Sequence, residues 1–366
     1  MDSCGPLGIY VNPRIYGSAL RRDDLYAKVG RLQQVAGITP FEYSGGRADG
    51  VRALEVRSGG GLRVVFLADR ALDPLFVEYK GVPLCWQSAN GVVAGEHDFF
   101  DSFFGGLMTT CGLTNFGPAG EDRWGSFKQH GRINHIDAEN VSAQLSDDGL
   151  TFEIYGQVRE TRLFGESLVL RRWWSIPVGG NSIELRDVVS NEGASAWPHM
   201  MLYHCNAGFP LLADGTRIHL SHSGMRARDT QAEKGLKLWN RGGPPDANFQ
   251  EQVFIHDMCA VGGENDAVAL IENSNVNGES LGLAVFFSVR SLPAAMTWRM
   301  LGYGTYVMAV EPANCAAIQG RSFAKEHNML KMIEPGESVS YSLRFLLLDD
   351  ADGIEALRGK ISLSQK

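Results

Sequence analysis

Short apolar runs separated by turn residues are the feature that most constrains what this chain folds into. Alternating or β-branched residues fill segments 62–68, 75–79, 150–159, 167–176, 182–190, 267–272, 281–289, 306–311 and 338–348. Turn signals rich in Gly, Pro and Asn lie between them, at 59–61, 178–181, 191–193 and 334–337. Strands of this length and spacing predict an all-β chain in which two large, mainly antiparallel sheets pack as a sandwich. Helical patterning is confined to 19–34 and 351–360, so helices are expected only as minor elements.

The chain shows no internal boundary. No Pro/Ser-rich linker, block of like charge or fixed-period repeat interrupts its 366 residues. We therefore expect one sandwich domain over 51–366, with residues 1–50 as an N-terminal lead-in packed on it. The longest strand-poor stretch, 224–249, is predicted to be a loop over one face, and long loops on rigid sheets often border sites.

Composition argues against several classes of principal partner. The net charge is −8 and no Lys/Arg-rich run occurs, which disfavours nucleic acid or an anionic membrane as the principal partner. The first residues lack a basic region followed by an apolar one, and no apolar stretch approaches the roughly 20 residues that span a bilayer. A cytoplasmic location is therefore expected. The scattered cysteines form no C-x-x-C pair, so reduced, packed thiols are expected rather than a zinc knot.

Glu311 is the first candidate for chemistry. It ends the apolar run at 306–310 and is followed by Pro312. An ionised carboxylate at the end of a buried strand costs several kcal/mol unless it is paired or its pKa rises, and a raised pKa suits a general base. The alternative is a strand-end glutamate that faces solvent.

His204 and Asn206 form the second candidate group. In a strand they share one face, whereas His199 faces the other way, which argues against a joint metal clamp by the two histidines. A polar pair flanked by apolar residues suits a pocket. The alternative is a core histidine bonded to a neighbouring carbonyl.

Two further segments carry groups that suit hydrogen bonding. His130, beside Gly131, lies in a polar, loop-like run, for which the alternative is a solvated turn. Arg70 follows an alternating strand, where its guanidinium can grip vicinal hydroxyls or pair with a neighbouring aspartate. Trp86, Trp124 and Trp298 lie close in sequence to these groups; aromatic faces stack on sugar rings, and the same residues equally suit a core.

Several familiar signatures are absent. The sequence has no phosphate-binding G-x-x-x-x-G-K-[ST], no dinucleotide G-x-G-x-x-G after a strand, no G-x-S-x-G and no H-E-x-x-H. No two histidines are spaced as H-x-H. Metal and cofactor are therefore not expected.

The ordered set of His130-Gly131, His204-x-Asn206 and Glu311-Pro312 resembles the aldose 1-epimerase, or galactose mutarotase-like, family. Further points of similarity are Asp69-Arg70, the 109–112 segment, Trp298-Arg299 and the turn at 334–337 before the last strand, which is similar to the family's closing hairpin. The resemblance covers roughly residues 50 to 350 and is closest to a longer, poorly characterised branch.

The resemblance implies a two-sheet supersandwich that binds a small-molecule sugar in an open cleft without a cofactor. It implies that Glu311 is the base, that His204 is the acid, that His130 binds near the ring oxygen and that Arg70 holds a hydroxyl. The remaining expected substrate-binding residues are Asn206, His256, Asp257, Trp298, Arg299 and Asn314.

The expected activity is interconversion of sugar anomers by acid–base ring opening, since one base and one acid suffice for it. Two other classes stay open. A polysaccharide lyase or glycoside hydrolase uses similar residues, although hydrolases normally need two carboxylates about 5 to 10 Å apart. A non-catalytic sugar-binding protein would keep the aromatic residues without needing an aligned acid and base.

Overall fold

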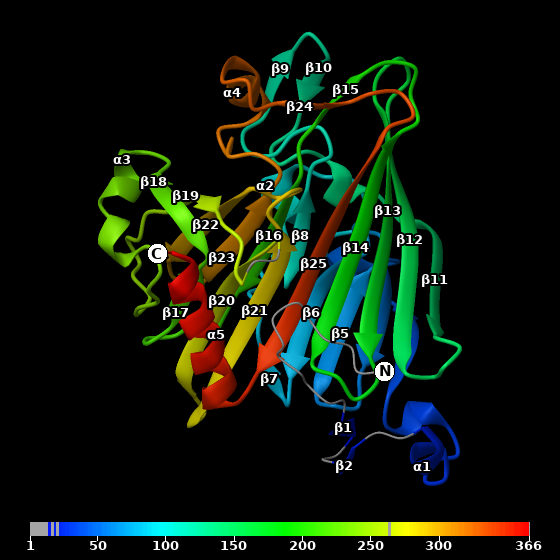
Figure 1. Ribbon diagram of the computed structural model, residues 1–366. Coiled ribbons are helices and arrows are strands. Elements are labelled where there is room, and N and C mark those ends of the chain that lie inside the picture. Colours follow the sequence, from blue (N-terminus) through cyan, green and yellow to red (C-terminus); the bar gives the residue numbers. More distant parts are fainter. Residues whose placement is uncertain (1–13, 16–17, 20–21, 263–264, 366) are drawn as a thin grey trace.

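The computed structural model describes residues 14–15, 18–19, 22–262 and 265–365, and most of its regular structure lies in three antiparallel sheets (Figure 1). The largest sheet has eight strands in the order β11 (Glu139–Leu145), β12 (Thr151–Thr161), β13 (Ser167–Pro177), β14 (Ser182–Asn191), β25 (Ser338–Leu348), β21 (Glu279–Ser288), β20 (Asp266–Val276) and β17 (Arg217–Leu220). This sheet contains the long alternating runs of the sequence.

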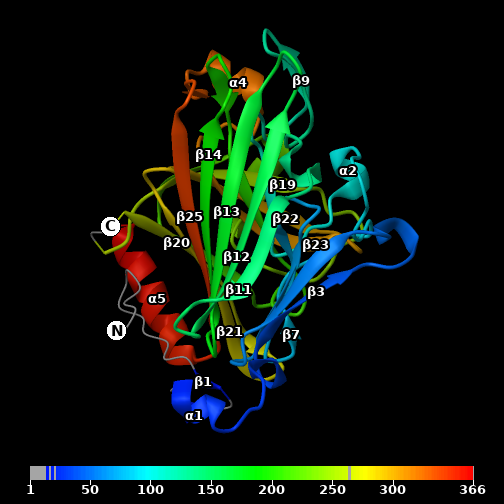
Figure 2. The same cartoon turned by 90° about the vertical axis from the view of Figure 1, so that its right-hand side faces the viewer.

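Two smaller sheets oppose it. The six-stranded sheet has the order β18 (His222–Ala227), β19 (Gln252–Met258), β22 (Ala294–Leu301), β23 (Tyr306–Ala313), β16 (Leu202–Ala207) and β8 (Met108–Cys111). The five-stranded sheet has the order β3 (Gly37–Glu42), β4 (Arg52–Arg57), β5 (Leu62–Leu67), β6 (Asp73–Tyr79) and β7 (Val82–Pro83). Figure 2 shows the strands of the eight-stranded sheet in front of β22 and β23.

The remaining elements are short. Three two-stranded sheets are formed by β1 (Arg14–Ile15) with β2 (Ser18–Ala19), β9 (Gly120–Asp122) with β10 (Gly125–Phe127), and β15 (Trp197–His199) with β24 (Lys331–Ile333). The α-helices are α1 (Arg22–Tyr26), α2 (Phe99–Ser102), α3 (Thr230–Glu233), α4 (Arg321–Glu326) and α5 (Ala351–Ser364). Single 3₁₀ turns cover Leu32–Gln34, Gly46–Ala48, Ile133–His135 and Leu236–Leu238.

One core lies between the layers. Leu185 of the eight-stranded sheet, Tyr203 of the six-stranded sheet and Phe66 of the five-stranded sheet belong to the same buried cluster. A second cluster packs α5 against the outer face of β20, β21 and β25. The predicted class, an all-β sandwich of mainly antiparallel sheets with minor helices, is confirmed.

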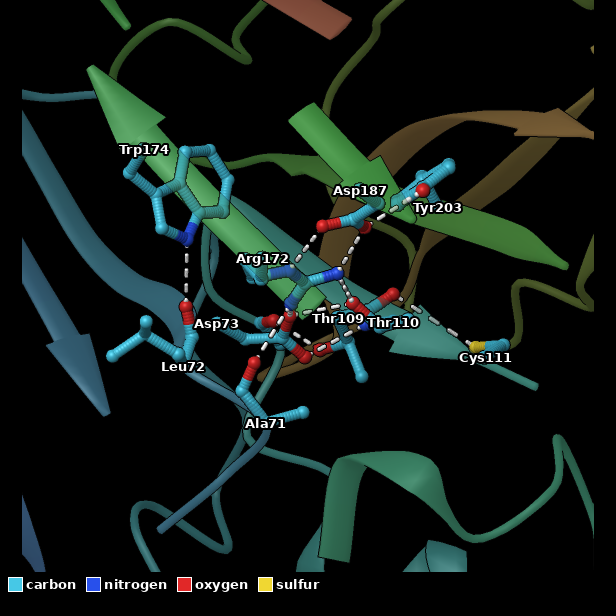
Figure 3. Close-up of polar contacts among 11 residues, drawn as sticks. Ala71, Leu72, Asp73, Thr109, Thr110, Cys111, Arg172, Trp174, Asp187 and Tyr203 are labelled. Atoms are coloured by element: carbon cyan, nitrogen blue, oxygen red, sulfur yellow. Dashed lines mark hydrogen bonds and ion pairs between the residues drawn. The ribbon is translucent and has the colours of Figure 1, made fainter. Parts of the chain in front are cut away.

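A buried ionic cluster joins the three sheets (Figure 3). Arg172 on β13 donates to Asp187 on β14 at 2.9 and 2.7 Å, to Asp73 on β6 at 2.5 Å and to the Thr110 hydroxyl on β8 at 2.8 Å. The Tyr203 hydroxyl on β16 donates to Asp187 at 2.8 Å. Arg172 and both carboxylates are fully buried, and burial raises the pKa of Asp73 to about 6. These hydrogen bonds run between residues of all three sheets, so the cluster helps to fix the sheets relative to each other.

Three local expectations needed correction. Instead of one helix, segment 19–34 contains α1 and a separate 3₁₀ turn. The 224–249 segment is not a plain loop, since it holds the end of β18, α3 and a 3₁₀ turn. The turn at 334–337 does not close a hairpin, because β24 pairs with β15.

The expected boundary at residues 50 and 51 falls in the connection between β3 and β4. Of residues 1–50, the segment 37–42 forms β3, which pairs with β4 in the five-stranded sheet. In the part of the chain that the structure describes, no helix combines the length and the apolar character that crossing a membrane requires.

Candidate active site

Strand register brings His204 and Glu311 together. β16 pairs with β23 so that Leu202 lies opposite Ala313 and Cys205 opposite Val310, which sets His204 opposite Glu311. His204 Nε2 and Glu311 Oε1 lie 3.3 Å apart. The two side chains are only 7% and 3% exposed. The low exposure of the Glu311 side chain excludes the alternative in which it faces solvent.

The alternation of each strand explains why both side chains leave the core. On β16, Tyr203 and Cys205 enter the cluster between the layers, whereas Leu202 enters the cluster on the opposite face. His204 shares that opposite face with Leu202 because side chains alternate along a strand. On β23, Val310 packs into the interlayer core and Ala313 does not. A period of two therefore places the histidine and the glutamate on the same side of the six-stranded sheet.

Burial moves the pKa values of the two groups in opposite directions. Loss of hydration raises the pKa of Glu311 to about 8; the nearby Glu251 carboxylate raises it further and Arg228 opposes the shift. Loss of hydration lowers the pKa of His204 to about 3, and the adjacent His130 ring adds to that shift. Near neutral pH both groups therefore favour their uncharged forms, and the pair holds one transferable proton.

The alternative for His204 is a core histidine that is hydrogen-bonded to a neighbouring carbonyl, and the structure does not show that bond. Its Nδ1 atom is buried without a hydrogen-bond partner, as is the side-chain oxygen of Asn206. Asn206 donates to the Gly106 carbonyl at 3.1 Å and to the His204 carbonyl at 2.9 Å. Asn206 therefore lies beside His204 on the strand, as the alternation predicts, but it does not line the pocket described below.

His130 completes the group from a loop. Its ring centre lies 6.0 Å from that of His204. The Gly117 backbone N–H donates to His130 Nδ1 at 3.4 Å, which leaves the ring proton on Nε2 in the neutral imidazole. Burial lowers the pKa of His130 to about 4, so the ring is neutral at pH 7.

The backbone conformation explains why a glycine follows His130. Both residues have positive φ, 55° and 77°. A Cβ atom on Gly131 would lie 1.9 Å from the Gly112 carbonyl oxygen, closer than any real contact. Glycine is required for this close approach, and the tight turn holds His130 in place.

These residues line a pocket of about 960 Å³. Its walls are mainly aromatic and polar, and among the described residues they include Trp86, Phe99, Phe100, Phe103, Gln129, His130, His204, Arg228, Asp229, Phe249, Glu251, Trp298, Glu311 and Gln319. Trp86 and Trp298 both take part, with ring centres 6.1 Å apart, whereas Trp124 does not line this pocket.

Arg228 and Glu251 are pocket residues that the sequence reading missed. Arg228 donates to Glu251 at 2.8 Å and to Asp229 at 2.7 Å, and the Trp298 indole N–H donates to Glu251 at 3.1 Å. The signal for Glu251 is its place in the polar triplet 250–252, directly before the apolar run that begins at Val253. Arg228 belongs to the 224–249 segment that was expected to border a site.

Two of the expected sugar-binding residues are buried against other segments of the chain. Arg70 is 1% exposed; its guanidinium lies 2.7 Å from His135 Nδ1 and donates to the Val93 carbonyl. The Asn314 side chain accepts from the Met201 backbone N–H at 3.1 Å. Neither residue lines the pocket, because backbone groups of neighbouring segments satisfy both side chains.

Three other expected residues also lie outside the pocket. His256 is buried and contacts the Thr297 hydroxyl at 2.9 Å. Asp257 is an exposed side chain 3.4 Å from Arg226. Arg299 stacks over the ring of Phe249, at 4.9 Å, and so sits one layer behind the pocket wall.

Among the described residues, no group of three or more His, Cys, Asp or Glu side chains is arranged to hold a metal ion. The cysteines that the structure describes are all unbonded thiols, and Cys4 lies outside the described residues.

Solved structures place this architecture in the galactose mutarotase-like class. A proposed aldose 1-epimerase from Klebsiella pneumoniae subsp. pneumoniae superposes with a TM-score of 0.83 at 23% identity, over 94% of this chain and 91% of that chain. A galactose mutarotase-like protein from Clostridium acetobutylicum gives 0.63 at 12% identity, over 87% and 100%. Galactose 1-epimerase from Lactobacillus acidophilus gives 0.56 at 11% identity, over 86% and 99%. These likenesses establish the fold.

Within that class, the chain belongs to the family described as a domain of unknown function, DUF4432, whose model matches residues 48–347. No curated protein matches the sequence.

Proposed function

We propose that this protein is a carbohydrate epimerase of the aldose 1-epimerase type, with Glu311 as base and His204 as acid. The single observation that carries the proposal is the buried pair itself, 3.3 Å apart on one wall of a large pocket. Solved structures described as proposed aldose 1-epimerases share the fold and support the same reaction class.

The spacing of the pair suits the reaction. Anomer exchange removes the proton from the anomeric hydroxyl and delivers a proton to the ring oxygen. Both oxygens are bonded to the same carbon, so a base and an acid that contact each other can each reach one of them. The ring C–O bond then breaks, the carbonyl carbon rotates, and the reverse transfers close the ring on its other face.

The reaction cycle needs one proton that Glu311 and His204 can share. In the free protein burial favours that proton on Glu311, because it raises the pKa of the carboxyl and lowers that of the imidazole. As base and acid, Glu311 must ionise and His204 must gain the proton in the sugar complex. A sugar hydroxyl that donates to the Glu311 carboxylate favours this shift.

The neutral His130 is suited to bind a sugar oxygen. Its Nδ1 atom is occupied by the Gly117 N–H, so Nε2–H is its available donor. We assign it to orientation of the ring oxygen rather than to proton transfer.

Hydrolysis is a weaker candidate. A glycosidase needs a second carboxyl group free to act as acid or nucleophile. The other pocket carboxylates, Asp229 and Glu251, are both engaged by Arg228.

The test is anomer exchange measured by saturation-transfer NMR over a panel of free aldoses. We expect Glu311→Gln and His204→Gln each to slow catalysed exchange by about 10²- to 10⁴-fold while sugar binding persists. Asp257→Asn removes an exposed carboxylate of the same sheet and should behave as wild type. If the wild-type protein binds sugars without accelerating exchange, the binding-protein alternative replaces this proposal.

A further inference from the structure

The pocket beside the Glu311–His204 pair extends well beyond one sugar ring. We infer that the substrate is a neutral reducing saccharide of at least two rings, whose reducing-end ring lies on the pair. The inference rests on the proposed function and specifies the substrate class of the same site.

A line of aromatic rings leads from the pair to solvent. We refer to Phe103, Phe99 and Phe100, on and beside α2, as the aromatic strip. The Phe103 ring centre lies 5.2 Å from that of His204, Phe99 lies 4.6 Å from Phe103, and Phe100 lies 5.8 Å from Phe99. Each ring contacts the next, so the strip continues past the space that a ring held by His204 and Glu311 would occupy.

Exposure along the strip rises toward its outer end. Phe103 and Phe99 are 9% and 6% exposed, whereas Phe100 is 74% exposed although it lines the pocket. An exposed aromatic ring that lines the mouth of a pocket offers a contact surface to a ligand in that pocket. The C–H face of a sugar ring provides such a contact.

The size of the pocket agrees with this length. Its volume of about 960 Å³ lies at the upper end of the roughly 300–1,000 Å³ range of drug-sized ligand sites, and a single hexose is smaller than such ligands. A second ring would contact Phe100 and fill space that a monosaccharide leaves to water.

The charge of the lining disfavours acidic sugars. Arg228 is the one Arg or Lys among the described lining residues, and it is already paired with Asp229 and Glu251. A phosphate or carboxylate on the sugar would meet two carboxylates and one engaged cation. Uncharged hydroxyls meet no such repulsion, and they find acceptors in the same carboxylates.

The experiment compares kcat/KM for anomer exchange of glucose, maltose, cellobiose, lactose, glucose 6-phosphate and glucuronate. We expect at least one disaccharide to exceed glucose by about tenfold, the effect of one partly buried aromatic contact. Glucose 6-phosphate and glucuronate should fall at least tenfold below glucose. Phe100→Ala should lower the disaccharide-to-glucose ratio by about tenfold.

Phe164→Ala is the matched control, since this ring is 99% exposed on the β12–β13 hairpin and does not line the pocket. It should leave the ratio unchanged. Glucose turnover equal to or above that of every disaccharide, or faster turnover of an acidic sugar, overturns the inference while the proposed function stands. Absence of accelerated exchange for every sugar overturns both.

Discussion

Replacement of Glu311 by Gln should stabilise the folded protein, and increasingly so as pH rises. The pKa of Glu311 is raised from 4.5 to about 8 on folding because the carboxyl is buried. Above pH 4.5 the unfolded chain releases this proton and the folded protein retains it. Stability is therefore greatest below the unfolded pKa and is lost as pH rises through the folded value.

The magnitude follows from the width of that window. One pH unit corresponds to about 1.36 kcal/mol per retained proton, and the slope levels off as the folded pKa is reached. Between pH 6.5 and 8.0 the stability gap between Glu311→Gln and wild type should widen by about 1.5 kcal/mol. His204 adds little in this range: its pKa is lowered on folding, so its proton linkage lies mainly below 6.5.

Urea unfolding at pH 6.5, 7.25 and 8.0 measures the gap directly as a difference in unfolding free energy. Asp257→Asn, an exposed carboxylate, should show a constant gap. A constant gap for Glu311→Gln as well would mean that Glu311 is already ionised in the folded protein, and the argument for a burial-raised base would be refuted.

Three further changes test the supporting structure. Gly131→Ala should lower unfolding free energy by about 3 kcal/mol or more, because its Cβ meets the Gly112 carbonyl at positive φ; Gly81→Ala, with open space at similar φ, should cost only about 1 kcal/mol in the same urea assay. Arg172→Met strands two buried carboxylates and should cost about 3–5 kcal/mol, and an effect below 1 kcal/mol would contradict the ionic cluster. Glu251→Gln removes a charge that raises the pKa of Glu311, so the pH profile of kcat/KM should move to lower pH; a shift to higher pH would reverse the assigned sign.

Much of the fold was predictable because its signals are local. Alternation along β12, β13 and β25 is visible in sequence, since one face of each strand meets the core. The placement of His204 and Glu311 on one face follows from the same period of two, once β16 and β23 pair. Pairing itself joins residues more than a hundred positions apart, and no local pattern encodes it.

Two residues that were predicted to bind sugar, Arg70 and Asn314, lie outside the pocket for one shared physical reason. Arg70 and Asn314 are polar and stand near strand ends, as sugar ligands do. Their partners are backbone carbonyls and amides of remote segments, such as Val93 and Met201. Every backbone offers such groups, so a buried side chain satisfied by them looks the same in sequence as one that faces a ligand.

Arg228 and Glu251 show the converse case. An arginine beside acidic residues looks like an ordinary surface ion pair in sequence, and an exposed pair contributes little to stability. Here the pair stands beside the indole of Trp298, in the wall of the pocket that contains Glu311. Its charges oppose each other in setting the Glu311 pKa, with Glu251 raising it and Arg228 lowering it. The pair therefore gives the pocket hydrogen-bonding groups while leaving burial as the main determinant of the Glu311 pKa. That division of roles arises only when β18, β19, β22 and β23 lie side by side in one sheet.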